Sequence, residues 1–188
     1  MPGSKDLLTT TSFHTEVSTV TVLETAKKMI DYSHGNLHDI NHFMKVYAYA
    51  KMIADEEQLD PDTQKLVEMI ALVHDIACPL CRVKYGNTNG KNQEKESAAL
   101  IAEFFKDSNL PQDFTDRISF LVSHHHTLDQ IDGIDYQIII EADYLVNADE
   151  SHFSGHNIKN MYDKIFKTET GKFLLRSMYQ NCLENETL

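Results

Sequence analysis

The chain has 188 residues, a length typical of one compact domain with its own hydrophobic core. Its 29 Asp and Glu residues outnumber its 17 Lys and Arg residues, which gives a formal net charge of -12. This charge argues against a nucleic-acid polymer as partner, because such binding depends on Lys and Arg that neutralise phosphates. No apolar run approaches the roughly 20 residues that cross a bilayer, so we also expect no membrane association.

The N-terminus and the cysteines indicate a cytoplasmic protein. Residues 1–18 are polar and rich in Thr and Ser, and they contain no basic head followed by an apolar stretch. We expect them to form a flexible arm before a single domain over residues 19–188. The three cysteines cannot all pair within one chain, which favours a reduced compartment. Whether copies of the chain associate into a homo-oligomer is left open.

Helical periodicity runs through the sequence from residue 19 onwards. Apolar residues recur at three- and four-residue steps and predict helices near 19–30, 37–58, 61–79, 94–106 and 111–124. Asp60 is expected to cap the third of these, with Pro61 at its first position. Gly and Asn are frequent in 81–92, which predicts a loop there.

The remaining segments complete an all-helical pattern. Residues 135–148 are apolar, and 136–140 could be a strand by composition, but the length of the segment and the Glu141-Ala142 that follows residue 140 favour a helix. Further C-terminal helices are expected within 157–184, and strand patterns are otherwise almost absent. The sequence therefore predicts an all-α fold, a helical bundle.

Metal-ligating side chains stand where core residues would be expected. Asp143 lies inside an apolar segment, and a buried carboxylate is usually paired or bound to a metal. Asp75 ends another apolar run, directly after His74. Together with His42, these residues would offer two imidazoles and two carboxylates, a set that suits a borderline divalent ion. Four protein ligands on a six-coordinate ion leave positions for water or substrate, as in a catalytic site.

The order and spacing of these four residues resemble the H…HD…D pattern of the HD-domain metal-dependent phosphohydrolase superfamily. The flanking residues are similar as well, in the segments Asp39-x-x-His42, Ala71-Leu72-Val73-His74-Asp75-Ile76 and Glu141-Ala142-Asp143-Tyr144-Leu145. The resemblance covers about residues 25–150 and includes features of uncharacterised bacterial HD-domain proteins. It implies an HD-domain-like bundle with metal ligands His42, His74, Asp75 and Asp143. The implied activity is metal-dependent hydrolysis of a small phosphorylated metabolite, such as a nucleotide, as a phosphomonoesterase or phosphodiesterase.

The number of metal ions follows from a departure from the family pattern. Members with two metals carry a His shortly before the helix that begins here near Ser97, where this chain has Gln93-Glu94. We therefore expect one divalent ion (Mn, Fe, Co, Ni, Zn or Mg), and a second metal is doubtful. The oxygenase branch of the superfamily needs two irons, so the same departure argues against an iron-dependent oxygenase.

Several further residues are candidates for binding or turning over a substrate. Arg82 and Lys84 follow Asp75 in the expected loop, and both could bind phosphate, with Lys84 stabilising transition-state charge. His124 and His125 could contact phosphate or protonate the leaving oxygen. Asp75 would act in catalysis as well as in metal binding.

Other features leave alternatives open. His38 is four residues before His42 and would share its helix face, which makes it a candidate substrate contact. Cys78 and Cys81 have the spacing of half a zinc site but no second pair, so they are either packed thiols or a redox pair. The same site would also serve a non-catalytic sensor that binds a metal and a nucleotide without turnover.

Overall fold

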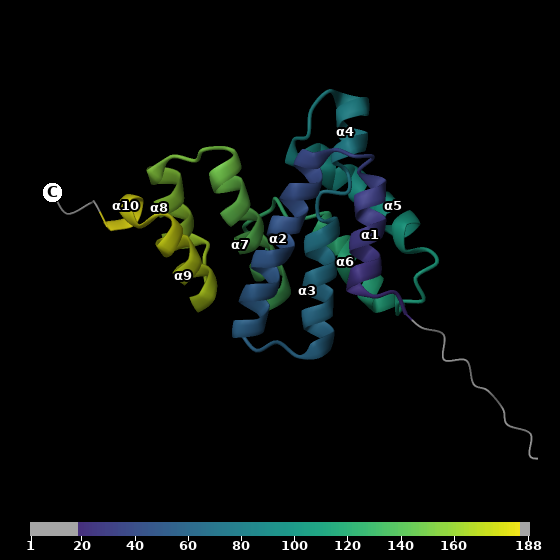
Figure 1. The fold of residues 1–188 in the computed structure, drawn as a ribbon, viewed down its shortest axis with the longest axis horizontal. Helices are drawn as coiled ribbons and strands as arrows, with labels where there is room; N and C mark the ends of the chain where they lie inside the picture. Colours follow the sequence, from purple (N-terminus) through teal and green to yellow (C-terminus); the bar gives the residue numbers. More distant parts are fainter. Residues whose placement is uncertain (1–18, 185–188) are drawn as a thin grey trace, which may run out of the picture.

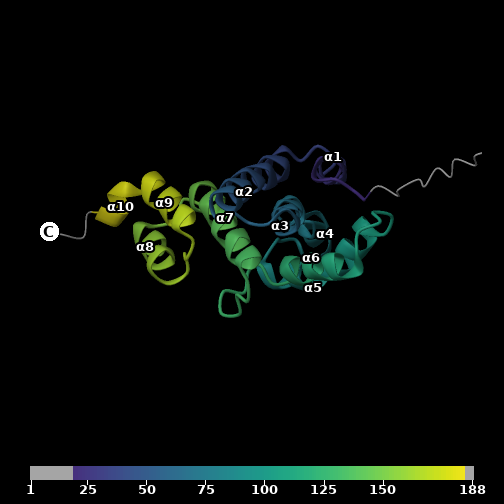
Figure 2. The ribbon, with the colours of Figure 1, turned by 90° about the horizontal axis from the view of Figure 1, so that it is seen from below.

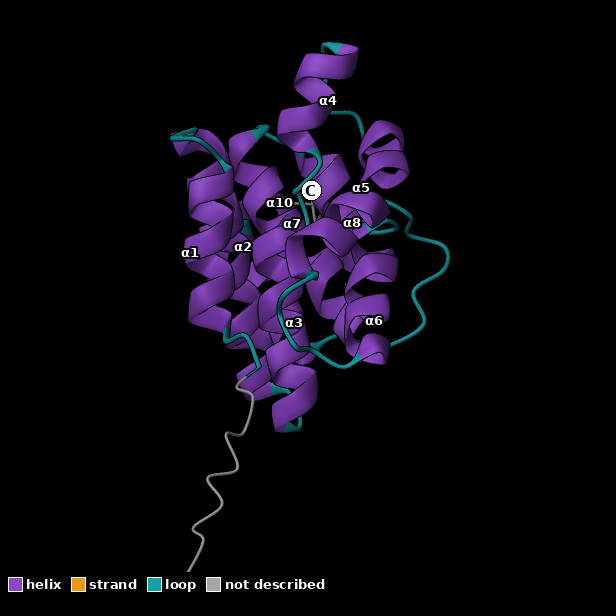
Figure 3. Ribbon diagram, turned by 90° about the vertical axis from the view of Figure 1, so that its right-hand side faces the viewer, coloured by secondary structure: helices purple, strands orange, loops and turns teal. Residues whose placement is uncertain are grey.

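A computed structural model of the chain describes residues 19–184, and all regular secondary structure in that part is helical (Figure 3). The helices are α1 (Val22–Tyr32), α2 (Leu37–Glu56), α3 (Pro61–Val73), α4 (Cys78–Tyr85), α5 (Gly90–Phe105), α6 (Gln112–Val122), α7 (Ile134–Glu150), α8 (Gly155–Lys164), α9 (Glu169–Met178) and α10 (Gln180–Glu184). The predicted all-α fold is confirmed, while the arm predicted for residues 1–18 lies outside the described residues. Within the described residues, no helix is long and apolar enough to cross a membrane.

The centre of the bundle is formed by α2, α3 and α7, with α2 packed between the other two (Figure 1). Helix α1 covers α3, and α5 and α6 pack against each other behind it. Helices α8–α10 form a group on the far side of α7 (Figure 2). One cluster of buried apolar residues extends from α1 to α9. The predicted metal ligands His42 and Asp143 lie on α2 and α7, and His74 and Asp75 directly follow α3.

Local sequence signals explain where several helices begin. The side chain of Asp60 accepts hydrogen bonds from the backbone N–H groups of Asp62 and Thr63, and Pro61 occupies the first turn of α3, as predicted. Helix α7 covers the segment 135–148, so the helical interpretation of that apolar run is confirmed. Most of its side chains are buried because it packs against α2, α3 and α9.

The prediction for residues 74–92 is wrong in two respects. The third helix ends at Val73 rather than near Pro79, and residues 74–77 form turns. Much of the expected loop is instead helix α4, which projects from one end of the bundle (Figures 1 and 3). Pro79 lies in the first turn of this helix, where its missing N–H costs nothing, so it begins a helix rather than ending one. Gly86 ends α4 with a positive φ of 69°.

A buried carboxylate holds the C-terminal helices against α7. Glu141 is 0% exposed and accepts hydrogen bonds from the backbone N–H groups of Lys167 (2.6 Å) and Thr168 (3.0 Å). The Thr168 hydroxyl and the Gln137 amide also donate to it. Burial raises the pKa of Glu141, although these hydrogen bonds act in the opposite direction. The chain leading into α9 is thus fixed by one side chain of α7.

Substituting Gly171→Ala is expected to destabilise the protein. A Cβ atom at this position would lie 1.9 Å from Glu141 Oε2 and 2.7 Å from Thr168 Oγ1. Overpacking of this kind typically costs about 1–3 kcal/mol. Gly155→Ala is the matched control, because its Cβ would meet nothing closer than 3.5 Å. Urea denaturation should show a lower midpoint for Gly171→Ala alone, and equal midpoints would contradict this account of the junction.

Candidate metal centre

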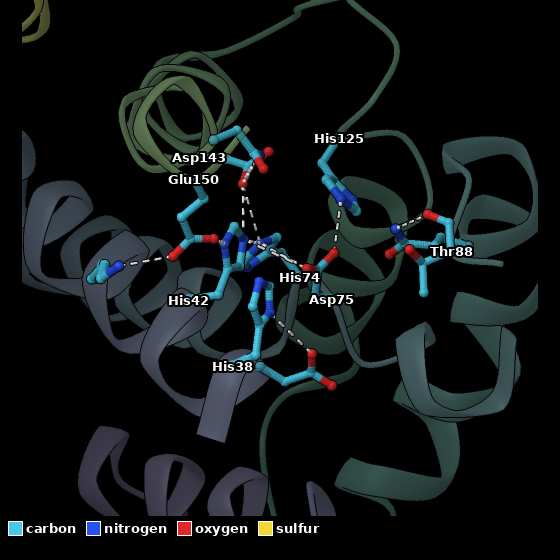
Figure 4. Close-up of polar contacts among 12 residues, drawn as sticks. His38, His42, His74, Asp75, Thr88, His125, Asp143 and Glu150 are labelled. Atoms are coloured by element: carbon cyan, nitrogen blue, oxygen red, sulfur yellow. Dashed lines mark hydrogen bonds and ion pairs between the residues drawn. The ribbon is translucent and has the colours of Figure 1, made fainter. Parts of the chain in front are cut away.

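Three segments of the central helices bring the four predicted metal ligands together. His42 lies on α2, His74 and Asp75 lie in the turn that follows α3, and Asp143 lies on α7. Their side chains point toward one another (Figure 4). Because α2 packs against both α3 and α7, the fold itself produces this convergence.

The spacing of the donor atoms matches the space around one metal ion. His42 Nε2 lies 3.2 Å from His74 Nε2, 3.2 Å from Asp143 Oδ1 and 3.5 Å from Asp75 Oδ2. His74 Nε2 lies 3.5 Å from Asp143 Oδ1 and 3.8 Å from Asp75 Oδ2. Ligands bound at about 2.0–2.2 Å from a common ion are separated from their neighbours by roughly 3–4 Å. The donor set could therefore hold a divalent ion with little movement.

Hydrogen bonds on the far side of each ring fix which nitrogen faces the centre. His74 Nδ1 donates to the carbonyl oxygen of Ala71 at 2.8 Å, since a carbonyl can only accept. His42 Nδ1 lies 2.8 Å from Glu150 Oε2, and Lys45 Nζ donates to the other oxygen of that carboxylate at 2.9 Å. In the neutral rings both Nε2 lone pairs then face the centre, 3.2 Å apart. A cation between them would remove this repulsion, and a carbonyl or carboxylate behind the ring is the usual support for a metal-binding histidine.

The electrostatics of the centre favour a positive charge. Burial by itself lowers the pKa of His42, but the carboxylates of Asp143 and Asp75 outweigh it and raise this pKa to about 9. Burial by itself raises the pKa of Asp143, yet His42 and His74 hold it well below its ordinary value. The raised pKa of His42 shows that the carboxylates stabilise positive charge on the rings, and the lowered pKa of Asp143 shows that this carboxylate stays ionised. The centre therefore keeps anionic oxygens beside the imidazoles, and a metal ion could balance them in place of the histidine protons.

Glu150 orients His42, so its removal should weaken metal binding. We expect Glu150→Ala to lower the affinity for the divalent ion about 10- to 100-fold, the range typical of lost support behind a metal-binding histidine. Competition with a chromogenic chelator measures this change. Asp149→Ala is the control, because Asp149 is the adjacent and exposed carboxylate on the same helix. Equal affinities for the two variants would contradict the role of Glu150.

A second donor set adjoins the first and shares Asp75. One atom each from Asp75, His125 and His126 lies within 4.8 Å of the others. His125 Nδ1 donates to the carbonyl oxygen of Val122 at 2.9 Å, so Nε2 of the neutral ring is an acceptor. That atom is buried, lacks a hydrogen-bond partner in the structure and lies 3.7 Å from Asp75 Oδ1. Asp75 thus turns one oxygen toward each set (Figure 4).

A cavity of about 270 Å³ opens onto these donors. It is lined by His38, Asp39, His42, Asp75, Cys78, Arg82, Thr88, Gln93, His126, Asp143, Asn147, Glu150 and Ser151. The Arg82 guanidinium is held by two hydrogen bonds to the Asp39 carboxylate. The side chain of His38 is 74% exposed, so it forms part of the cavity wall on the solvent side. A larger cavity of about 510 Å³ lies between α3 and α6, but its lining includes no histidine or cysteine from residues 19–184.

Lys84 and His124 are not brought to this cavity. Arg82 and Lys84 lie two positions apart on α4 and so point in roughly opposite directions. Lys84 Nζ donates to Glu96 Oε1 on α5 at 2.8 Å instead. The His124 ring stacks on Phe120, with 4.5 Å between ring centroids, and its Nδ1 donates to the Phe120 carbonyl oxygen.

Sequence reasoning missed several residues of the cavity. Asp143, Asn147 and Glu150 are spaced i, i+4 and i+7 on α7, so they share one helix face, and this periodicity could have identified the last two. His126 carried no such signal, because it lies in a turn. Cys78 and Cys81 are buried free thiols whose pKa is raised by burial, which suits packed thiols rather than a reactive pair.

The fold and the centre define a class of protein, an all-helical bundle with a buried His/Asp cluster that could hold a divalent metal. The sequence matches the HD domain family over residues 39–149, and the chain belongs to that family. A solved relative is the predicted HD superfamily hydrolase from an uncultured Thermotogales bacterium. It is 21% identical, with a TM-score of 0.60 over 87% of this chain and 86% of that chain, which shows a shared fold. A search of curated proteins gave no match.

Proposed function

We propose that the protein is a metal-dependent phosphohydrolase that acts on a small phosphorylated metabolite, such as a nucleotide. The observation that carries this proposal is the convergence of imidazole Nε2 atoms and carboxylates beneath a cavity with an arginine in its wall. Membership of the HD domain family supports hydrolytic chemistry, and the solved relative is itself a predicted HD superfamily hydrolase.

The residues of the donor sets and of the adjoining cavity would have separate roles in phosphoryl transfer. A divalent ion held by His42, His74, Asp75 and Asp143 would polarise a phosphoryl oxygen and lower the pKa of water. Arg82 uses two of its five N–H groups on Asp39, which leaves others for phosphate oxygens. The protonated Nε2 of His125, which has no hydrogen-bond partner and lies 3.7 Å from Asp75 Oδ1, would donate a proton to the leaving oxygen and recover one from water. Burial alone would lower the pKa of His125, but Asp75 outweighs it and raises this pKa, which favours the protonated acid form.

Phosphate release from a panel of phosphate esters tests the proposal. Protein purified without chelators is first analysed for metal, and the panel is then run with added Mn, Co, Ni or Mg. We expect phosphate release from at least one ester, and loss of that release after treatment with a chelator. Diesters are followed by chromatography, because their hydrolysis releases no inorganic phosphate. Thermal stabilisation by nucleotides without hydrolysis of any ester would overturn the proposal in favour of a sensor. Oxygen consumption with two bound irons would overturn it in favour of an oxygenase.

A further inference from the structure

A second, largely apolar cavity lies beside the metal cavity. Its volume is about 250 Å³, and it is bordered by α7, α8 and the segment that connects α6 to α7. The apolar part of its wall consists of Leu128, Ile140, Tyr144, Phe153 and Met161. The rings of Tyr144 and Phe153 contact each other with 5.5 Å between their centroids. We call this space the aromatic groove.

The aromatic groove and the metal cavity share part of their walls. His126, Asp143 and Asn147 line both, and Asp143 is the carboxylate that approaches His42 and His74. A molecule lying across these three side chains would therefore reach the metal donors with one end and the groove with the other. Each cavity is slightly smaller than the roughly 300 Å³ of the smallest typical ligand pockets, whereas the two together exceed it.

The charges of the two cavities differ. Arg82 lies in the wall of the metal cavity, whereas no Lys or Arg is among the described residues that line the aromatic groove. The groove instead offers uncharged polar atoms at its edge. Asn157 accepts a hydrogen bond from the Tyr144 hydroxyl at 2.5 Å, which leaves its own amide N–H groups as donors. Asn147 donates to Asp143 Oδ1 at 2.8 Å, which leaves its amide oxygen as an acceptor.

We infer that the aromatic groove binds an uncharged, planar aromatic group carried by the phosphorylated substrate, while the phosphate lies at the metal donors. Aromatic side chains stack on planar rings, and the two amides can pair with donors and acceptors on the ring edge. A second phosphate or other anionic group would meet no Lys or Arg among the described lining residues of the groove, whose two imidazoles, His125 and His126, lie at the end that adjoins Asp75. This inference rests on the proposed function, because it assigns the part of the substrate that is not hydrolysed.

Two phosphate esters that differ only in the aromatic group test this assignment. Adenosine 5′-monophosphate and ribose 5-phosphate both release a primary alcohol, so their phosphate groups are matched in reactivity. Calorimetry on the metal-loaded full-length protein, with the methylene phosphonate analogues of these two compounds, measures binding without turnover. We expect the nucleotide to bind at least about tenfold more tightly than the sugar phosphate, as stacking on an aromatic side chain would provide.

Variants of the groove should remove this preference. Phe153→Ala and Leu128→Ala are expected to bring the two affinities together by weakening only the nucleotide. Leu128 is 39% exposed, so its substitution is a safeguard if Phe153→Ala folds poorly. Phe173→Ala is the control, because Phe173 lies on α9 outside the groove and is 61% exposed. Equal affinities in the unmodified protein, or equal effects of all three variants, would overturn the inference. Selective binding without phosphate release from the metal-loaded protein would leave the groove in place and overturn the proposed function alone.

Discussion

Replacing Asp75 with Asn is expected to abolish both metal binding and turnover. The two Asp75 oxygens face the two donor sets, so this single change weakens both, and the amide supplies no negative charge to a cation. Metal ions contribute several kcal/mol to the stabilisation of phosphoryl-transfer transition states, so we expect turnover to fall at least about a thousand-fold. Metal analysis of the purified variant and phosphate release with saturating metal measure the two effects separately.

Two carboxylates of α7 extend this prediction: Asp143 as a second expected metal ligand and Glu141 as the control. Asp143→Asn should behave like Asp75→Asn, because Asp143 Oδ1 lies 3.2 Å from His42 Nε2 and 3.5 Å from His74 Nε2. Glu141→Gln should retain its metal, since Glu141 lies two positions earlier and accepts its hydrogen bonds from the start of α9. Loss of stability without loss of metal is the expected result for Glu141→Gln. A full complement of metal in both Asp variants would refute the assignment of the centre.

The convergence of His42, His74, Asp75 and Asp143 was predictable because charged residues stand out in apolar segments. Asp143 interrupts a run of buried residues on α7, and His74 and Asp75 end another such run on α3. Burying such groups without partners is costly, so the sequence indicated that each of them has a charged, hydrogen-bonding or metal partner in the fold. Asp60 and Pro61 likewise placed the start of α3, because a cap and an N-terminal proline act locally.

The other residues of the cavity could not be predicted in the same way, because the local sequence does not determine which way their side chains point. Treating 81–92 as a loop left Arg82 and Lys84 free to face the same way, whereas helix α4 turns them apart. His124, His125 and His126 occupy consecutive turn positions, yet the His124 ring stacks on Phe120 whereas His125 and His126 lie beside Asp75. Periodicity indicates which way a side chain points in a helix but not in a turn. Which of the neighbouring residues line the cavity is therefore seen only in the folded structure.

The Arg82→Ala variant is expected to show the largest loss of substrate binding among the residues that do not bind metal. In the part of the chain that the structure describes, Arg82 is the one Lys or Arg that lines the metal cavity, and its side chain remains 40% exposed despite the pair with Asp39. Hydrogen bonds to charged groups contribute about 1.5–3 kcal/mol each, which corresponds to a 10- to 100-fold decrease in kcat/KM. Metal content should not change, because Arg82 is a cation and cannot bind the ion. Steady-state kinetics on the best ester of the panel measure this effect.

Lys84→Ala separates this role from a general effect of positive charge near the cavity. Lys84 is on the same helix and carries the same charge, but its Nζ is bound to Glu96 on α5. We therefore expect kcat/KM of Lys84→Ala to stay within about twofold of the unmodified protein, because a partly exposed ion pair contributes little beyond local packing. Arg82→Lys should fall between the two, since it keeps the charge but loses the planar fork that binds a phosphate through two bonds. If Lys84→Ala lost as much activity as Arg82→Ala, phosphate recognition would depend on the overall field of α4 and not on contact with the Arg82 guanidinium.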